Sequence, residues 1–154
     1  MAIHQLDRVN PVVNAPGKMR IATDADVPLL IQWVQDFSRE IHEPVHEDPK
    51  AHVARRLAQN QMFLLCVDDV PVSLTAVAGP TPNGIRINSV FTPREYRKHG
   101  YATALVAGVS RRMLDSGKKF CFLYTDLANP TSNKIYAGIG YRRIADQLQI
   151  SFSP

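Results

Sequence analysis

Apolar residues along this chain follow two patterns, short continuous runs and positions spaced three or four residues apart. The first pattern predicts strands and the second predicts amphipathic helices. A strand is expected at residues 19–22, followed by a helix capped by Thr23 or Asp24 and a second helix at residues 50–59. The predicted inward face of the first helix consists of Val27, Leu30, Ile31, Val34, Phe37 and Ile41.

The middle of the chain reads as antiparallel strands. Residues 62–67 and 70–77 are apolar runs separated by Asp68-Asp69, which predicts a hairpin. Asn83-Gly84 is a further turn signal, and it leads into an expected strand at residues 85–91.

The second half predicts a parallel strand pair. Apolar and small residues recur with helical spacing from Tyr101 to Met113, Gly117 ends that helix, and residues 119–125 form an apolar strand. A strand, a helix and a strand in this order form a right-handed crossover whose two strands pair in parallel. A short helix capped by Asn129 and a last strand at residues 142–152 are expected to follow.

These elements predict an α/β (α+β) fold with a mixed, mainly antiparallel sheet of six to seven strands flanked by about four helices. The 154 residues, 45% of them hydrophobic, suffice for one domain core. We expect a strand and connector at residues 1–18, with a short strand at 3–9, and the domain itself at 19–154. Cys66 and Cys121 lie in apolar runs and are predicted to be buried thiols of a reducing compartment. No run is long enough for a bilayer, so we expect a cytoplasmic protein with no membrane partner.

Charge is distributed unevenly. Residues 24–48 hold seven acids and one base, whereas residues 86–143 hold eleven bases and three acids. The bases flank a glycine turn and are not interleaved with exposed aromatic residues, which favours a compact phosphate ligand over nucleic acid.

The segment Arg97-Lys98-His99-Gly100-Tyr101-Ala102 stands where a strand gives way to a helix. A glycine there lets backbone N–H groups approach an anion closely, and the positive end of the helix dipole favours phosphate. We call residues 97–103 the diphosphate turn.

These residues resemble the GCN5-related N-acetyltransferases, which transfer an acyl group from acyl-coenzyme A to an amine. Arg97, Gly100 and Ala102 match the family's pyrophosphate motif, which is Arg or Gln, two residues, Gly, one residue, and Gly or Ala. Asn129, Ser132 and Tyr136, followed by Gly140-Tyr141, resemble its second motif. The resemblance covers about Met19 to Phe152.

The resemblance implies acetyl-CoA as co-substrate, no metal, and Tyr136 as the catalytic residue that protonates the departing sulfur. It implies that the pantetheine arm lies between two splayed parallel strands, near 89–92 and 124–126. The implied cofactor-binding residues are Val90, Phe91, Thr92, Arg97, Lys98, His99, Gly100, Tyr101, Ala102, Thr103, Asn129 and Ser132.

The acceptor and its general base stay open. Many relatives carry a glutamate on the strand that corresponds to residues 85–91, but this chain offers Asn88 and Ser89. Asp36, Glu40, His42 and Glu43 are candidates for a base or a cation site, and a water relay is an alternative. A small-molecule or peptide amine, rather than nucleic acid, is the expected partner. A homodimer and a missing N-terminal domain are both compatible with the sequence.

Two other functions compete with this interpretation. His42, Glu43 and His46 form a His-Glu-x-x-His pattern with His52 at third-ligand spacing, as in some zinc peptidases. Pro44 opposes the helix that such a site needs. The missing strand carboxylate is also compatible with a noncatalytic module that binds acyl-CoA as a sensor.

Overall fold

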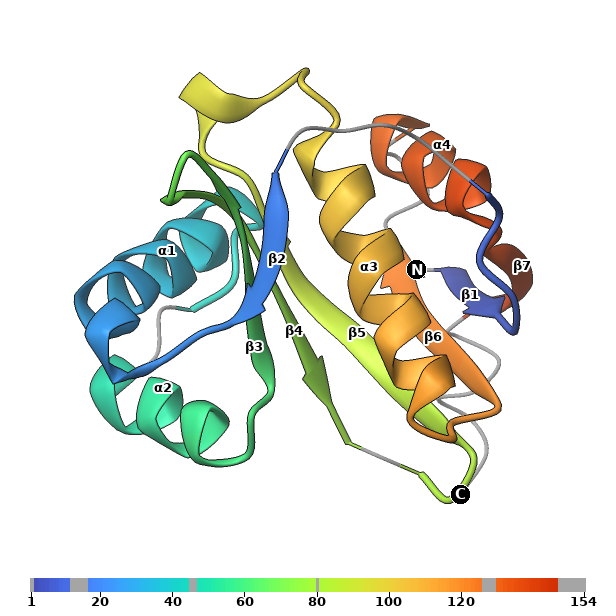
Figure 1. Cartoon of the computed structure of the whole chain (residues 1–154), viewed down its shortest axis with the longest axis horizontal. Coiled ribbons are helices and arrows are strands. Elements are labelled where there is room, and N and C mark those ends of the chain that lie inside the picture. Colours follow the sequence, from blue (N-terminus) through green and yellow to red (C-terminus); the bar gives the residue numbers. More distant parts are fainter. Residues whose placement is uncertain (1, 12–16, 45–46, 80, 126–129, 147–154) are drawn as a thin grey trace. The chain divides into compact units, whose positions relative to one another are not determined.

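The computed structural model describes residues 2–11, 17–44, 47–79, 81–125 and 130–146 (Figure 1). In these residues, hydrogen bonding joins seven strands into a mixed sheet with the order β2-β3-β4-β5-β6-β1-β7. The chain forms two compact units. Unit 1 consists of Met1–Asn14, Val77–Asn88 and Val106–Pro154, and unit 2 consists of Ala15–Ala76 and Ser89–Leu105.

Unit 2 contains the first three antiparallel strands and the helices between them. Its elements are β2 (Lys18–Ile21), a 3-10 turn (Asp24–Asp26), α1 (Val27–Glu40), α2 (Pro49–Ala58), β3 (Met62–Val67) and most of β4 (Val70–Ala78). Asp68 and Asp69, between β3 and β4, have φ values of 50° and 65°, as a two-residue hairpin turn of the primed type requires. The predicted hairpin is therefore confirmed.

The core of unit 2 lies between α1, α2 and one face of its strands. Leu30, Trp33 and Val34 of α1 are buried against Val53 of α2 and Leu64 of β3. Ile41, which was expected on the inward face, is 41% exposed. That prediction was wrong because α1 ends at Glu40, so the helical spacing no longer applies to the next residue.

Unit 1 contains the other end of the sheet. Its elements are β1 (Ala2–Leu6), the first part of β5 (Gly84–Phe91), most of α3 (Tyr101–Asp115), β6 (Phe120–Thr125), α4 (Pro130–Ile139) and β7 (Arg142–Asp146). The parallel pairing of β5 with β6 joins Gly84–Arg86 to Phe120–Phe122, as the crossover predicts. β1 pairs antiparallel with both β6 and β7.

The mixed sheet and its parallel pair confirm the predicted fold class. β1 ends at Leu6, earlier than the expected residue 9, and the end of the last predicted strand lies outside the described residues. Both cysteines are buried free thiols, as expected. None of the helices in the described ranges has the length and apolar character needed to cross a bilayer. The division of residues 1–18 from 19–154 stays a prediction.

Candidate active site

The diphosphate turn in unit 2 connects the end of β5 to the start of α3. A 3-10 turn (Arg94–Tyr96) follows β5, and Lys98 and Gly100 then adopt left-handed φ values of 67° and 79°. The first hydrogen bond of the helix runs from the Ala104 N–H to the Gly100 carbonyl, at 3.0 Å. The N–H groups just before Ala104 therefore have no acceptor within the helix, and such amides bind anions.

Left-handed backbone at a residue other than glycine is costly, and two such residues lie in the stretch from β5 to the start of α3, one inside the strand and one in the diphosphate turn. Ser89 has φ 52° inside β5, and Lys98 has φ 67° in the diphosphate turn. Each conformation costs about 1–2 kcal/mol and persists only where its surroundings impose it. Strain of this kind is concentrated at functional sites, so both positions support a site here.

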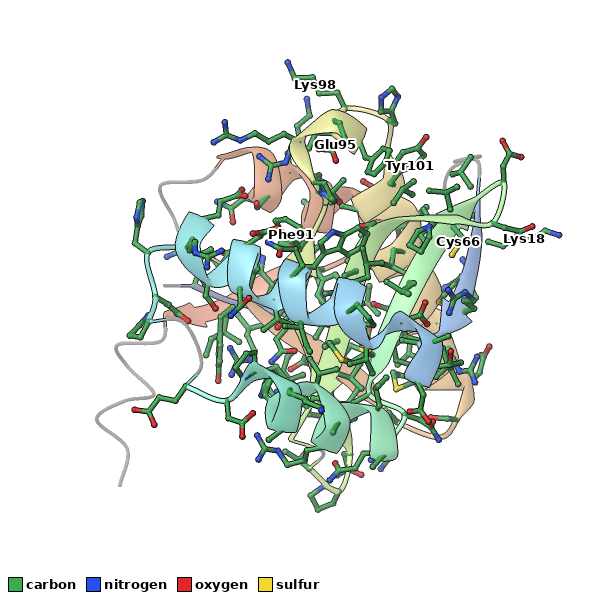
Figure 2. All side chains as sticks on the ribbon, turned by 90° about the vertical axis from the view of Figure 1, so that its left-hand side faces the viewer. Lys18, Cys66, Phe91, Glu95, Lys98 and Tyr101 are labelled. Atoms are coloured by element: carbon green, nitrogen blue, oxygen red, sulfur yellow. The ribbon has the colours of Figure 1, made fainter. Side chains whose placement is uncertain are left out.

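Lys98 and His99 have exposed side chains in the diphosphate turn, and its other side chains are half-buried. The Lys98 side chain extends away from the ribbon in Figure 2, and it is exposed. His99 is exposed as well, and its ring stacks on the half-buried Tyr101 ring with 5.3 Å between centroids. A cation and an aromatic face are thus accessible beside the amides.

The guanidinium of Arg97 is held by protein groups. Its Nη2 donates to both carboxylate oxygens of Glu40 at 2.6 and 2.7 Å, and its Nε donates to the Thr92 carbonyl at 2.8 Å. Glu40 is the last residue of α1. The side chain of Arg97 therefore links α1, the end of β5 and the diphosphate turn within unit 2.

The end of β5 packs against the core of unit 2. Phe91 is buried, and its ring packs against Trp33 and Phe37 of α1, with centroids 6.0 and 6.3 Å apart. The Ser73 hydroxyl donates to the Phe91 carbonyl at 3.2 Å and lies 2.8 Å from the Thr92 hydroxyl. Val90 and Thr92 are half-buried.

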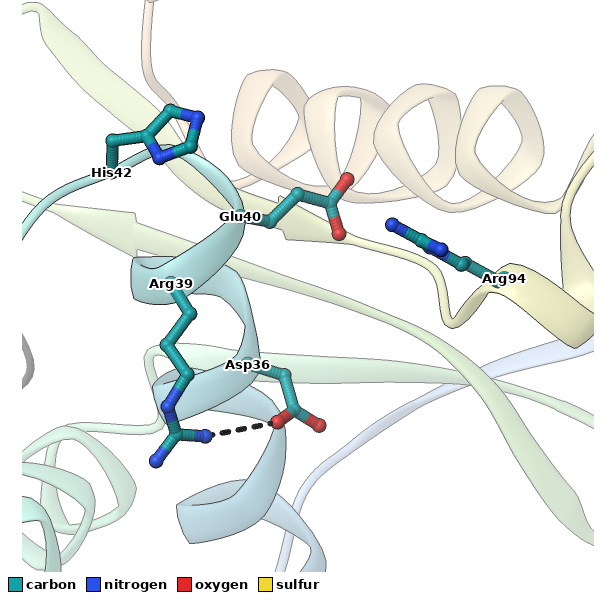
Figure 3. A pocket seen from close by; sticks show the side chains of 5 residues that line it. All are labelled: Asp36, Arg39, Glu40, His42 and Arg94. Carbon is teal, nitrogen blue, oxygen red and sulfur yellow. Dashed lines mark hydrogen bonds and ion pairs between the residues drawn. The ribbon is translucent and has the colours of Figure 1, made fainter.

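An open hollow of about 430 Å³ lies on unit 2, lined by Asp36, Arg39, Glu40, His42 and Arg94 (Figure 3). Asp36 accepts hydrogen bonds from Gln32 at 2.8 Å and from Arg39 at 3.3 Å. Three of the four candidate bases, Asp36, Glu40 and His42, therefore border the hollow. Asp36 and Glu40 already have hydrogen-bond partners.

Tyr136 belongs to unit 1 and sits on α4. Its side chain is 8% exposed, and its ring meets the Tyr141 ring edge-on, with centroids 6.2 Å apart. Burial raises the pKa of Tyr136 to about 12, so the phenol keeps its proton at any physiological pH. Ser132 is half-buried on the same helix, and Asn129 lies outside the described residues.

The model of the Acetyltransferase (GNAT) family matches residues 28–141. The chain belongs to the GNAT acetyltransferase family. Comparison with curated proteins finds no match.

Solved structures with the same fold include several GNAT proteins. An acetyltransferase from Colwellia psychrerythraea is 11% identical with a TM-score of 0.75, over 92% of this chain and 52% of that one. A putative acetyltransferase from Agrobacterium tumefaciens is 20% identical with a TM-score of 0.69, over 84% and 95%. A predicted acetyltransferase with acetyl-CoA, from Clostridium acetobutylicum, is 15% identical with a TM-score of 0.62, over 86% and 97%.

β5, the strand on which a glutamate was expected from the family resemblance, carries Asn88 and Ser89 instead. For Asn88, one side-chain atom stands out. Its Oδ1 atom is buried and has no hydrogen-bond partner among the described residues. A buried carbonyl oxygen without a donor is costly, so it favours a donor supplied by a ligand or water. Nearby on β5, the Arg86 guanidinium lies 4.3 Å from the centre of the Tyr124 ring.

The described part of the His-Glu-x-x-His pattern does not have the geometry of a zinc-peptidase site. Such a site needs His42 and His46 one turn apart on a helix. However, α1 ends at Glu40 and the backbone at His42 has φ 59°, while His46 lies outside the described residues. Among the residues that the structure describes, no group of three or more His, Cys, Asp or Glu side chains could hold a metal.

Sequence reasoning missed two site features in unit 2. Ser73, on β4, bonds to the end of β5, 18 residues away. A single polar residue within an apolar strand does not indicate which residue it will contact. The pairing of Glu40 with Arg97 spans 57 residues. The opposite charges of the two regions were visible in the sequence, but they do not identify which acid meets which base.

Proposed function

We propose that this GNAT chain transfers the acetyl group of acetyl-CoA to a primary amine by direct attack. The observation that carries the proposal is the diphosphate turn, whose amides before Ala104 have no helical acceptor and lie beside Lys98. Amides at a helix start, together with an exposed cation, suit a diphosphate. The GNAT fold neighbour described with acetyl-CoA supports the same co-substrate.

The chemistry needs three contributions from this chain. The diphosphate turn binds the coenzyme, and the pantetheine arm extends along the end of β5, where a backbone N–H of Val90 or Phe91 polarises the thioester carbonyl. The amine attacks as its neutral form, so one proton must leave it beforehand. The new C–N bond forms as the C–S bond breaks, and the thiolate leaves with the electron pair.

Tyr136 is proposed to assist the leaving thiolate. With a pKa of about 12, it holds its proton well beyond neutral pH. A thiol has a reference pKa of about 8.5, so complete transfer of that proton costs roughly 5 kcal/mol. A hydrogen bond from the phenol to the developing thiolate is therefore the contribution that we assign to Tyr136, with the proton finally supplied by solvent or by the attacking amine.

Asn88 is proposed to orient the acceptor rather than deprotonate it. An amide cannot act as a base near neutral pH, but its unpartnered Oδ1 can accept a hydrogen bond from an N–H of the amine. The proton lost by the amine then leaves through water. This arrangement predicts that activity rises with pH until the amine itself is neutral.

The test is release of free thiol from acetyl-CoA with a broad panel of amines. We compare wild type with Tyr136→Phe, and use Tyr96→Phe as a control that removes a phenol elsewhere. Tyr136→Phe should lower the rate about tenfold to a hundredfold while leaving coenzyme affinity unchanged. A Tyr136→Phe enzyme as fast as wild type would remove the tyrosine from its role.

The absence of a carboxylate on β5 is compatible with one other function, a noncatalytic acyl-CoA sensor. In that case acetyl-CoA protects the protein against heat, but no amine in the panel releases thiol. Thiol release and thermal protection, measured on the same protein, therefore separate the two functions.

A further inference from the structure

Glu40 and Arg97 form an ion pair at the diphosphate turn. One guanidinium nitrogen, Nη2, lies 2.6 and 2.7 Å from the two carboxylate oxygens of Glu40. The Glu40 and Arg97 side chains are 43% and 37% exposed, so solvent weakens the attraction without removing it. An ion pair with this much solvent exposure contributes little to the free energy of unfolding. Its main effect is therefore local, on the segment that it holds in place.

The Glu40–Arg97 ion pair holds the chain segment that precedes α3. The Arg97 Nε donates to the Thr92 carbonyl at 2.8 Å, so the guanidinium spans the 3-10 turn that separates β5 from the diphosphate turn. Directly after Arg97, Lys98 adopts its left-handed φ of 67°. A strained residue keeps its conformation only when neighbouring contacts impose it.

We propose that Glu40 is a positioning residue that holds Arg97, and through it the diphosphate turn, in the shape that binds the coenzyme. This inference rests on the proposed function, because it assigns coenzyme binding to that turn. Glu40 fixes the segment before the ligand arrives, which reduces the ordering cost of binding. It is not the general base, since both of its oxygens accept from a guanidinium that stays charged.

Electrostatics alone predicts the opposite effect of removing Glu40. Without the carboxylate, the Arg97 guanidinium would be free to approach the diphosphate, and one negative charge near the anion would disappear. Coenzyme affinity would then rise. If Glu40 is a positioning residue, affinity falls, so the sign of the change distinguishes the two accounts.

The experiment measures binding of CoA and of acetyl-pantetheine, which lacks the diphosphate, by calorimetry. Glu40→Gln should weaken CoA binding about fivefold and leave acetyl-pantetheine binding unchanged. Glu43→Gln is the matched control, since it removes the same charge three residues away, and it should bind CoA like wild type. In turnover, Glu40→Gln should raise KM for acetyl-CoA and leave kcat unchanged.

The charge exchange Glu40→Arg with Arg97→Glu tests the pairing itself, and it should recover part of the CoA affinity lost in either single variant. Unchanged or tighter CoA binding by Glu40→Gln would overturn the inference. An equal loss for acetyl-pantetheine would overturn it too, because the effect would not concern the diphosphate. Wild-type protein that binds no CoA would instead overturn the proposed function.

Discussion

Most acidic residues between positions 24 and 48, which we call the acidic segment, have hydrogen-bond partners inside unit 2. Asp26 accepts from both terminal nitrogens of Arg20, Asp36 from Gln32 and Arg39, Glu40 from Arg97, and Asp48 from the Ala51 N–H. The pairing with Arg20 lowers the pKa of Asp26. A count of charges along the sequence therefore overstates the attraction that this segment exerts on a cationic acceptor.

His4 in unit 1 provides a pH test at the residue scale. It is buried in β1, and its Nε2 lies 2.9 Å from the Thr125 hydroxyl. Burial, with a smaller contribution from Arg143, lowers the pKa of His4 below its usual 6.5. The unfolded chain therefore binds a proton more readily than the folded protein, so stability falls as pH drops through about 6.5.

We expect the melting temperature of wild type to fall between about pH 7.5 and pH 5.5 by more than that of His4→Gln. The glutamine can still bond to Thr125 but carries no titrating group. Melting curves across this range give the comparison. Parallel pH profiles of the two proteins would contradict the assignment, whatever their absolute stabilities.

At the scale of elements, the end of α4 illustrates what a local pattern predicts well. The Tyr141 N–H bonds to the Tyr136 carbonyl at 3.0 Å and the Gly140 N–H to the Ala137 carbonyl at 3.1 Å, which is a Schellman ending. Gly140 has φ 123°, and an added Cβ would lie 2.8 Å from the Arg8 carbonyl oxygen. Glycine is required there by both conformation and space.

We predict that Gly140→Ala lowers the free energy of unfolding by about 2 kcal/mol. Gly138→Ala, two residues earlier within α4, is the matched control, because among the described residues no atom beyond its chain neighbours and its own helix backbone lies within 4 Å of the added carbon. It should raise stability by about 0.5–1 kcal/mol. Denaturant unfolding measures both, and a Gly140→Ala protein as stable as the Gly138→Ala protein would refute the steric argument.

Helices and strands were predictable where neighbouring residues in the sequence determine them. The hairpin at Asp68-Asp69 and the helix from Tyr101 follow from turn chemistry and apolar spacing. Trp33 was omitted from the predicted inward face although it is buried. The left-handed Ser89 inside β5 was not predictable, because serine in a strand carries no signal for it and the surrounding packing imposes the strain.

At the scale of the whole molecule, two short motifs in the right order identified the family that the comparison then confirmed. The motifs did not predict which strands β1 pairs with. β1 pairs with β6 through Ala2 and Thr125, more than a hundred residues apart, and with β7 on its other side. Nothing in a five-residue apolar strand specifies partners at that distance, since register depends on packing that only the folded chain provides.

The net charge of +4 and the basic segment at residues 86–143 lead to a prediction about salt. CoA is polyanionic, so its affinity should fall about tenfold as ionic strength rises from about 0.1 M to about 1 M, which shortens the Debye length from about 10 Å to about 3 Å. Acetyl-pantetheine lacks the phosphates and should show little change. Calorimetric titrations at several salt concentrations measure both ligands.

Paired variants separate overall charge from local charge. Lys98→Gln and Lys50→Gln remove the same charge from two exposed positions, one in the diphosphate turn and one on α2. If attraction acts locally, only Lys98→Gln reduces the salt dependence of CoA binding, because screening leaves distant charges little influence at physiological ionic strength. Equal reductions in both variants would mean that the net charge of the protein attracts CoA. In that case the charge in the diphosphate turn would contribute no more to the salt dependence than a charge elsewhere.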